Sequence, residues 1–169
     1  MPNQNPDHLL DRAETAIRSG RFGSPRQTDL RRAVSDAYYA AFHAILTAAA
    51  DAFVGRRHRG SRHYGLVYRS VDHRAIRELC QTVRLTTPSQ KYRPYIPVSG
   101  FDANLRDVAG HVLALQRQRN TADYDPTHDV SRSEAQAAVS AAREALACWH
   151  AASATERDTF LHLLLFPPR

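Results

Sequence analysis

The sequence contains a single lysine, Lys91, although lysine and arginine together number 23. Nearly all of the positive charge is therefore carried by arginine, whose planar guanidinium group suits bidentate binding of phosphate and carboxylate. Against 17 acidic residues the formal net charge is +6, and the sequence pI is about 9.8. This balance favours an anionic partner, although a genome that prefers arginine codons would produce the same excess.

Cysteine is also scarce. Cys80 and Cys148 lie within apolar helical patterns and show neither metal-ligand nor redox spacing, so we interpret both as small core residues in a reducing compartment. The sequence has no glycine-rich phosphate loop and no pair of histidines at metal-ligand spacing. Both absences disfavour nucleoside triphosphate hydrolysis by a P-loop and a structural zinc site. We expect no cofactor and no metal.

Long hydrophobic runs are missing as well. The N-terminal segment MPNQNPDHLL lacks the basic region and long apolar run that are typical of a secretory signal. The longest apolar run, Leu161 to Phe166, is interrupted by His162 and is too short to span a bilayer. We expect a cytoplasmic protein.

Apolar residues recur at steps of three and four along most of the chain, whereas no alternating strand pattern of any length is present. The sequence therefore predicts an all-α protein, an antiparallel helical bundle of four to five main helices in one domain over residues 1–169. Its core covers about 7–150, and a short C-terminal helix covers about 154–165. Predicted helix starts are marked by Asp7, Thr28 and Asp72 and by the capping-box pairs Ser131–Glu134 and Ser153–Glu156.

Two segments combine basic residues with loop composition. Glycines and clustered charge between Gly55 and Arg69 predict a loop, and two prolines between Ser89 and Gly100 predict an irregular segment. Both segments are interpreted as surfaces that contact phosphate, although arginine clusters also serve solubility. The predicted nucleic-acid-binding residues are Arg56, Arg57, Arg59, Arg62, Lys91 and Arg93.

The predicted helix over residues 28–54 carries two distinct lines of residues. One is an apolar stripe in which four of seven members are alanine, so a neighbouring helix can approach closely. Together with the apolar C-terminal segment, this stripe favours a twofold homodimer over a tightly packed monomer. The other line is polar and aromatic and consists of Arg32, Asp36, Tyr39 and His43.

An arginine interrupts the apolar pattern of the predicted helix over about 102–123. Residues 105, 108, 112 and 115 form one apolar face, and the next position along that face is Arg119. Burying an unpaired guanidinium costs several kcal/mol, and Asp123, four residues on, supplies a partner. Two interpretations stay open: an anion site in which Arg119 acts with Asn120, Asp123 and Tyr124, and a structural Arg–Asp pair that fixes the helix end.

Aromatic and histidine residues of the 28–54 helix are the next candidates. Tyr39 and His43 share a face, and they complete a polar pocket with Tyr38 if that face turns towards Arg119. His43 is suited to act as an acid or base near neutral pH. His63 is a second candidate base, and the arginines around it disfavour its protonated form.

Three segments together resemble the signatures of HEPN-domain proteins. These are LRRAVSDAYYAAFHAIL at 30–46, RNTADYD at 119–125 and, more weakly, SRHYG at 61–65. The resemblance spans roughly Leu9 to Leu146. It implies an all-α bundle that usually dimerises, and in many members a metal-independent endoribonuclease of toxin–antitoxin or phage-defence systems.

The resemblance also assigns residues. The active family pattern is an arginine, a polar residue that is often asparagine, and a histidine separated from the arginine by four to six residues. Arg119 and Asn120 match the first two, whereas Tyr124 stands at the first histidine position. Cleavage by the RNA 2′-hydroxyl requires a base near pH 7, and tyrosine, with a reference pKa near 10, is a poor one. Asp123, His43 and His63 are the candidate replacements.

Three hypotheses follow. The first is a homodimeric HEPN-type protein that binds RNA or a nucleotide through Arg119 and the basic loop. In this hypothesis its ribonuclease activity is weak or conditional, because the catalytic motif is degenerate. The second is a non-catalytic interaction module with a nucleotidyltransferase-like partner, in which Tyr124 is a modification target. The third is a helical structural protein whose charge is incidental.

Overall fold

The computed structural model describes residues 5–18 and 25–169, and the secondary structure of these residues is entirely helical. This confirms the all-α fold predicted from the apolar spacing. The described elements are α1 (Pro6–Arg18), α2 (Gln27–Val54), the 3₁₀ turn η1 (Arg56–His58), α3 (Arg62–Ser70), α4 (His73–Arg84), α5 (Ala103–Tyr124), α6 (Arg132–Ala151) and α7 (Ala154–Leu165).

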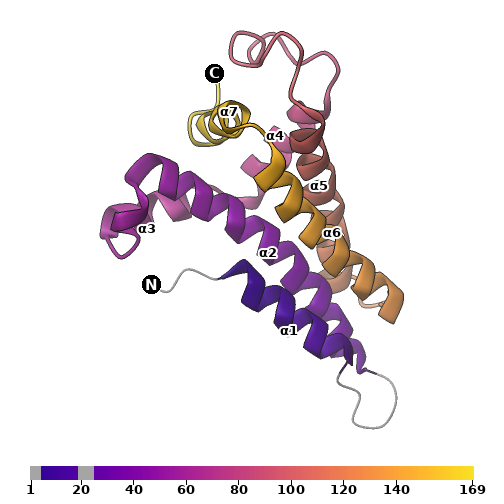
Figure 1. The fold of residues 1–169 in the computed structure, drawn as a ribbon. Helices are drawn as coiled ribbons and strands as arrows, with labels where there is room; N and C mark the ends of the chain where they lie inside the picture. The colour runs from indigo at the N-terminus through magenta and orange to yellow at the C-terminus, as the bar shows by residue number, and fades with distance from the viewer. Residues whose placement is uncertain (1–4, 19–24) are drawn as a thin grey trace.

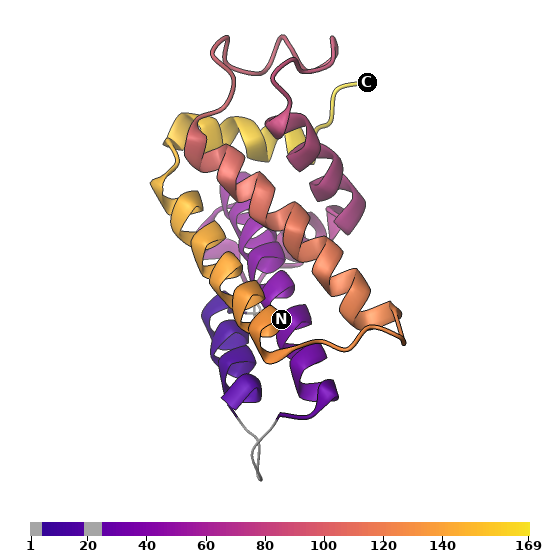
Figure 2. The same ribbon diagram turned by 90° about the vertical axis from the view of Figure 1, so that its right-hand side faces the viewer.

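Helix α2 is the centre of the bundle. It packs against α1, α3, α5, α6 and α7, and the long helices α1, α2, α5 and α6 run alongside one another in Figures 1 and 2. By length and composition alone, α2 is also the one helix in the described chain that is apolar enough to cross a membrane, with half of its most apolar window buried. The central helix of a bundle passes the same test because its neighbours cover it on several sides.

Helix starts were predicted with mixed success. Asp72 and Ser131 cap α4 and α6 as expected, and the capping box of Ser131 is complete. Thr28 was a wrong prediction, because α2 begins at Gln27 after Arg26 and has no side-chain cap. Asp7 was wrong too: the side chain of Asn5, two residues earlier, accepts the hydrogen bond from the Asp7 amide.

The last predicted capping box joins two helices. Ser153 caps α7 by accepting a hydrogen bond from the Glu156 amide. Glu156 does not return that bond to Ser153; its Oε2 instead accepts one from the backbone N–H of Asp102 at 2.6 Å. Asp102 caps α5 and also accepts a bond from Ser153 N at 3.3 Å. The starts of α5 and α7 are therefore tied together.

The prediction of a continuous loop from Gly55 to Arg69 was wrong. Residues 62–70 form α3, whose N-cap Ser61 accepts a hydrogen bond from the Tyr64 amide. Tyr64 is buried against α2, and its hydroxyl donates to Asp51 Oδ1 at 3.0 Å. The helix forms because one apolar side packs on α2, while its arginines point to solvent and escape the repulsion that favoured a loop.

The segment between α4 and α5 is irregular, as its prolines predicted. It forms turns anchored by the buried side chains of Tyr92, Ile96 and Phe101. Figures 1 and 2 both place this segment at the end of the bundle where α5 begins, opposite the end where α5 finishes. Lys91 and Arg93 therefore lie far from Arg119.

The alanine stripes that motivated a dimer are used within the chain. Ala37 and Ala41 of α2 are buried, as are Ala135, Ala138 and Ala142 of α6, and the two helices pack together. These alanines allow close helix packing inside one molecule, whereas Ala48 and Ala52, further along the α2 stripe, are partly buried and exposed, respectively.

Candidate functional site

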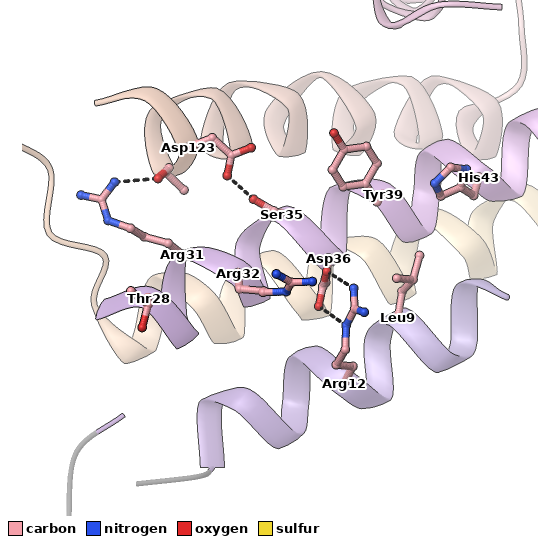
Figure 3. A pocket seen from close by; sticks show the side chains of 11 residues that line it. Leu9, Arg12, Thr28, Arg31, Arg32, Ser35, Asp36, Tyr39, His43 and Asp123 are labelled. Carbon is pink, nitrogen blue, oxygen red and sulfur yellow. Dashed lines mark hydrogen bonds and ion pairs between the residues drawn. The ribbon is translucent and has the colours of Figure 1, made fainter. Parts of the chain in front are cut away.

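An open groove lies between α1, α2 and the end of α5, and Figure 3 shows the side chains that line it. Its volume is about 560 Å³, within the range of ligand sites in proteins. All four members of the polar line predicted on α2 point into it. The lining residues are Leu9, Arg12, Thr28, Arg31, Arg32, Ser35, Asp36, Tyr39, His43, Ala122 and Asp123.

Arg119 lies directly behind this groove and holds two of its wall residues. Its Nη2 donates to the hydroxyl of Tyr39 at 2.9 Å, and its Nη1 donates to Asn120 Oδ1 at 3.2 Å. The carboxylate of Asp123 lies 2.7 Å from Nε but away from the N–H direction, so this contact is an ion pair without a good hydrogen bond. The predicted Arg119–Asp123 pair is present, and Arg119 also reaches α2.

Two aromatic rings enclose the guanidinium of Arg119. Its Cζ lies 5.5 Å from the ring centre of Tyr39 and 5.0 Å from that of Tyr124, distances at which cation–π attraction operates. Only 15% of the Arg119 side chain is exposed. Burial opposes the charge, but Tyr39, Asp123 and Tyr124 outweigh it and raise the pKa of Arg119. The arginine is thus a fixed cation, and Tyr124 is a 70% exposed ring stacked on its outer side.

The end of α5 is held by an arginine that the sequence did not single out. Arg31 of α2 donates from Nη1 to the carbonyls of Ala122, at 2.6 Å, and Asp125, at 3.0 Å, and from Nη2 to that of His128. These contacts satisfy carbonyl groups at the helix end that have no partner within the helix. Ser35 adds a hydrogen bond to Asp123 Oδ1, drawn in Figure 3. Arg31 and Ser35 therefore position the Arg119 segment against α2.

His43 lines the groove one helical turn after Tyr39, and the two rings stack with centres 5.7 Å apart. Its Nδ1 lies 2.8 Å from the hydroxyl of Tyr68 on α3, which fixes the ring. Burial, with a smaller contribution from His73, lowers the pKa of His43. The imidazole is therefore neutral near pH 7, the form in which it accepts a proton.

Tyr38, predicted to line the pocket, lies beneath it instead. The side chain is fully buried, and its hydroxyl is 2.7 Å from Nδ1 of His73 at the start of α4. Burial raises the pKa of this hydroxyl. Tyr38 supports the site from inside the core because its helical position points 100° away from Tyr39.

The three arginines that line the groove differ in their partners. Arg12 makes a bidentate ion pair with Asp36, at 2.7 Å from Nε to Oδ2 and 2.5 Å from Nη2 to Oδ1. Arg31 is engaged by backbone carbonyls. Arg32, in contrast, has no hydrogen bond or ion pair with any residue in the described ranges. It is the groove's available cation.

The predicted nucleic-acid-binding arginines divide into two groups. Arg59 pairs with Asp51 through two hydrogen bonds at 2.9 and 2.5 Å, and Arg56 Nε lies 3.5 Å from the same carboxylate. Arg57 and Arg62 are exposed, as is the candidate base His63. None of these residues lines the groove, so the structure does not bring His63 together with Arg119.

Two further observations concern metal binding and similarity to known proteins. Within residues 5–18 and 25–169, no group of three or more histidine, cysteine or acidic side chains is arranged to hold a metal ion. Comparison with family models, curated proteins and solved structures finds no match for this chain.

Proposed function

We propose that this chain is a HEPN-type module that binds RNA or a nucleotide in the groove between α1, α2 and α5. One observation supports this most strongly: eight of the eleven lining residues come from the two segments that carry the resemblance, 30–46 and 119–125. Segments separated by more than seventy positions in the chain form one concave surface. Such convergence is what a binding site built from two sequence signatures requires.

The chemistry of the groove suits a phosphate-bearing ligand. Arg32 supplies an available guanidinium for a phosphate oxygen. Tyr39, held by Arg119, offers a ring on which a base stacks. Arg119 acts as a positioning residue in this proposal, because its partners Tyr39 and Asp123 line the groove while it does not.

His43 extends the proposal to metal-independent cleavage. A neutral imidazole in the groove accepts the proton of a 2′-hydroxyl, the step for which the family uses the histidine that Tyr124 replaces here. Tyr124 does not line the groove, whereas His43 does. His43 is therefore the proposed base of a ribonuclease with a degenerate motif.

RNA binding and cleavage are measured on a mixed RNA pool with wild type, Arg32→Gln, Arg119→Ala and His43→Asn. Arg32→Gln should weaken binding about tenfold and flatten its salt dependence, since one phosphate contact is lost. The matched control Arg132→Gln removes an exposed arginine of α6 outside the groove. If Arg32→Gln and Arg132→Gln bind alike, the groove is not the RNA site.

Arg119→Ala tests the positioning role and requires a check of folding by circular dichroism. It should weaken binding while the helical signal is retained, because Tyr39 and Asp123 lose their common partner. His43→Asn should abolish cleavage and leave binding intact. Tyr124→His places a histidine beside Arg119 but outside the groove, so it should leave the cleavage rate unchanged; an increase would place the missing base at position 124 and contradict His43 as the base.

A second function is favoured by the exposure of Tyr124. Its ring, 70% exposed at the end of α5, is accessible to an enzyme that modifies tyrosine, as expected of an interaction module with a nucleotidyltransferase-like partner. Coexpression with a nucleotidyltransferase encoded beside this chain should add the mass of a nucleotide to wild type and none to Tyr124→Phe. An unmodified wild type in that experiment rejects this function.

The proposed assembly is a homodimer, as the resemblance implies, and its proposed location is the cytoplasm, as expected from the sequence composition. Multi-angle light scattering across a dilution series measures the molecular mass directly. A mass of one chain at all concentrations would contradict the dimer.

A further inference from the structure

A second cavity, the loop cavity, lies between the end of α4, the 85–102 segment and the start of α5. Its volume is about 640 Å³. The buried side chains of Val83, Ile96 and Phe101 form apolar parts of its wall. It lies at the end of the bundle opposite the groove's α5 wall, as Figures 1 and 2 show for the segment that surrounds it.

Three arginines line the loop cavity, each from a different element. Arg84 ends α4, Arg93 belongs to the 85–102 segment, and Arg106 lies in the first turn of α5. The guanidinium of Arg84 lies along α5 at Gly110: a Cβ built there would be 3.8 Å from its Cζ and Nε. Gly110 is one helical turn after Arg106, so the fold brings two of the three cations to the same stretch of α5.

These arginines lack acidic partners. None of the residues that line the loop cavity is acidic, and all of them lie in the described part of the chain. Within that part, the side chains of Arg84 and Arg106 make no hydrogen bond or ion pair, and Arg93 donates only from Nε to the carbonyl of Pro88. Asp107, the next residue after Arg106, does not line the loop cavity, and Asp102 accepts bonds from Leu105 N and Ser153 N.

Three other cavities lined by arginines of the described residues each include an acidic side chain. The groove has Asp36 and Asp123. The cavity beside Arg59 has Asp51, and the cavity beside Arg117 has Glu134. Arg84, Arg93 and Arg106 are exposed and give the lining of the loop cavity a positive charge that no acid in this lining offsets, which attracts a multivalent anion. Thr86 and Thr87 also line the cavity, and their hydroxyl groups provide neutral donors for the remaining oxygens of such an anion.

We propose that the loop cavity binds a diphosphate group, with Arg84, Arg93 and Arg106 as the charged ligands. This site is separate from the groove and does not depend on the function proposed for it. The diphosphate comes either from inorganic pyrophosphate or from a nucleoside diphosphate, and in both cases the guanidinium groups recognise the same oxygens.

Isothermal titration calorimetry with inorganic pyrophosphate tests the site in the full chain. Arg84→Gln/Arg106→Gln should weaken binding by about tenfold or more, because at least one charge-assisted bond is lost at each position. Arg77→Gln/Arg132→Gln, which removes two exposed arginines outside both sites, should bind as wild type does. Arg32→Gln should also keep the loop-cavity affinity, which separates this site from the groove.

The outcomes are distinct. If wild type does not bind pyrophosphate, or if the Arg84/Arg106 and Arg77/Arg132 variants lose equal affinity, the proposal is overturned. Thermal unfolding of each variant without ligand shows whether a loss of binding is a loss of folding. Gly110→Leu gives a second, charge-conserving perturbation: its side chain displaces the Arg84 guanidinium and should weaken binding, and unchanged affinity would count against the proposal. A nucleoside diphosphate that binds tighter than pyrophosphate identifies the nucleotide as the ligand.

Discussion

The ion pair between Arg12 and Asp36 should respond asymmetrically to truncation of its two partners. The Asp36 side chain is only 6% exposed, whereas that of Arg12 is 51% exposed. Arg12→Ala therefore leaves a buried carboxylate without its cation. Asp36→Ala leaves a guanidinium that water hydrates. The two variants break the same two hydrogen bonds, so any difference between them measures the cost of the charge left behind.

The expected losses in the free energy of unfolding follow from the exposed fractions of the Arg12 and Asp36 side chains. Breaking a fully buried pair costs about 3–5 kcal/mol, and the half-exposed Arg12 side of this pair argues for the lower end, about 3 kcal/mol. Asp36→Ala should cost about 1.5 kcal/mol, the value of hydrogen bonds to a charged group in a partly solvated site. The free energy of unfolding of the double variant should be close to that of Asp36→Ala, because the double variant has no carboxylate at position 36 that lacks its cation.

Urea unfolding followed by far-UV circular dichroism gives the free energy of unfolding of all three variants. The reasoning is refuted if Asp36→Ala costs as much as Arg12→Ala, or if the effects of the two single substitutions add in the double variant. The matched control Arg18→Ala removes another arginine of α1, and it should change stability by less than about 0.5 kcal/mol. Because α1 forms one wall of the groove, the same variants should also weaken ligand binding there.

Three further predictions concern stability. Burial lowers the pKa values of His43 and His73, so the folded state binds fewer protons than the unfolded chain; the stability present above about pH 6.5 should fall as the pH drops below that value, and His43→Gln should reduce this slope in thermal unfolding. Gly110→Ala should stabilise the protein by up to about 1 kcal/mol in urea, because the added Cβ makes only an ordinary 3.8 Å contact with Arg84 in a helix interior; a destabilised variant would show that Arg84 resists it. Ser131→Ala removes the complete capping box of α6 and should cost about 1 kcal/mol, with Ser140→Ala, an exposed serine further along the same helix, as the near-neutral control.

The candidate site was partly predictable. The polar line Arg32, Asp36, Tyr39 and His43 followed from helical spacing, and all four residues line the groove. The Arg119–Asp123 pair followed from a charge on an apolar face, and it is present. Both inferences succeeded because spacing along a single helix fixes which residues share a face.

Other members of the site gave no comparable signal. Nothing in the sequence distinguishes Arg12 and Arg31 from other arginines. Only the packing of α1 and α5 on α2 brings Arg12 to Asp36 and brings Arg31 to the carbonyl groups at the end of α5. Tyr38 and Tyr39 are adjacent in sequence, yet one is buried in the core and the other lines the groove. Which of two neighbouring aromatics faces the groove depends on where the other helices lie.

The sequence by itself determined the all-α class, the positions of most helices and the arginine that had to find a partner, because these depend on local spacing and on the cost of burying charge. Only the tertiary structure decided that Arg119 lies behind the groove wall and that His63 belongs to another surface. It also decided that Arg84, Arg93 and Arg106 share a cavity without an acid. Charge neutralisation depends on which side chains meet in space, and that is set by helix packing between segments far apart in the chain.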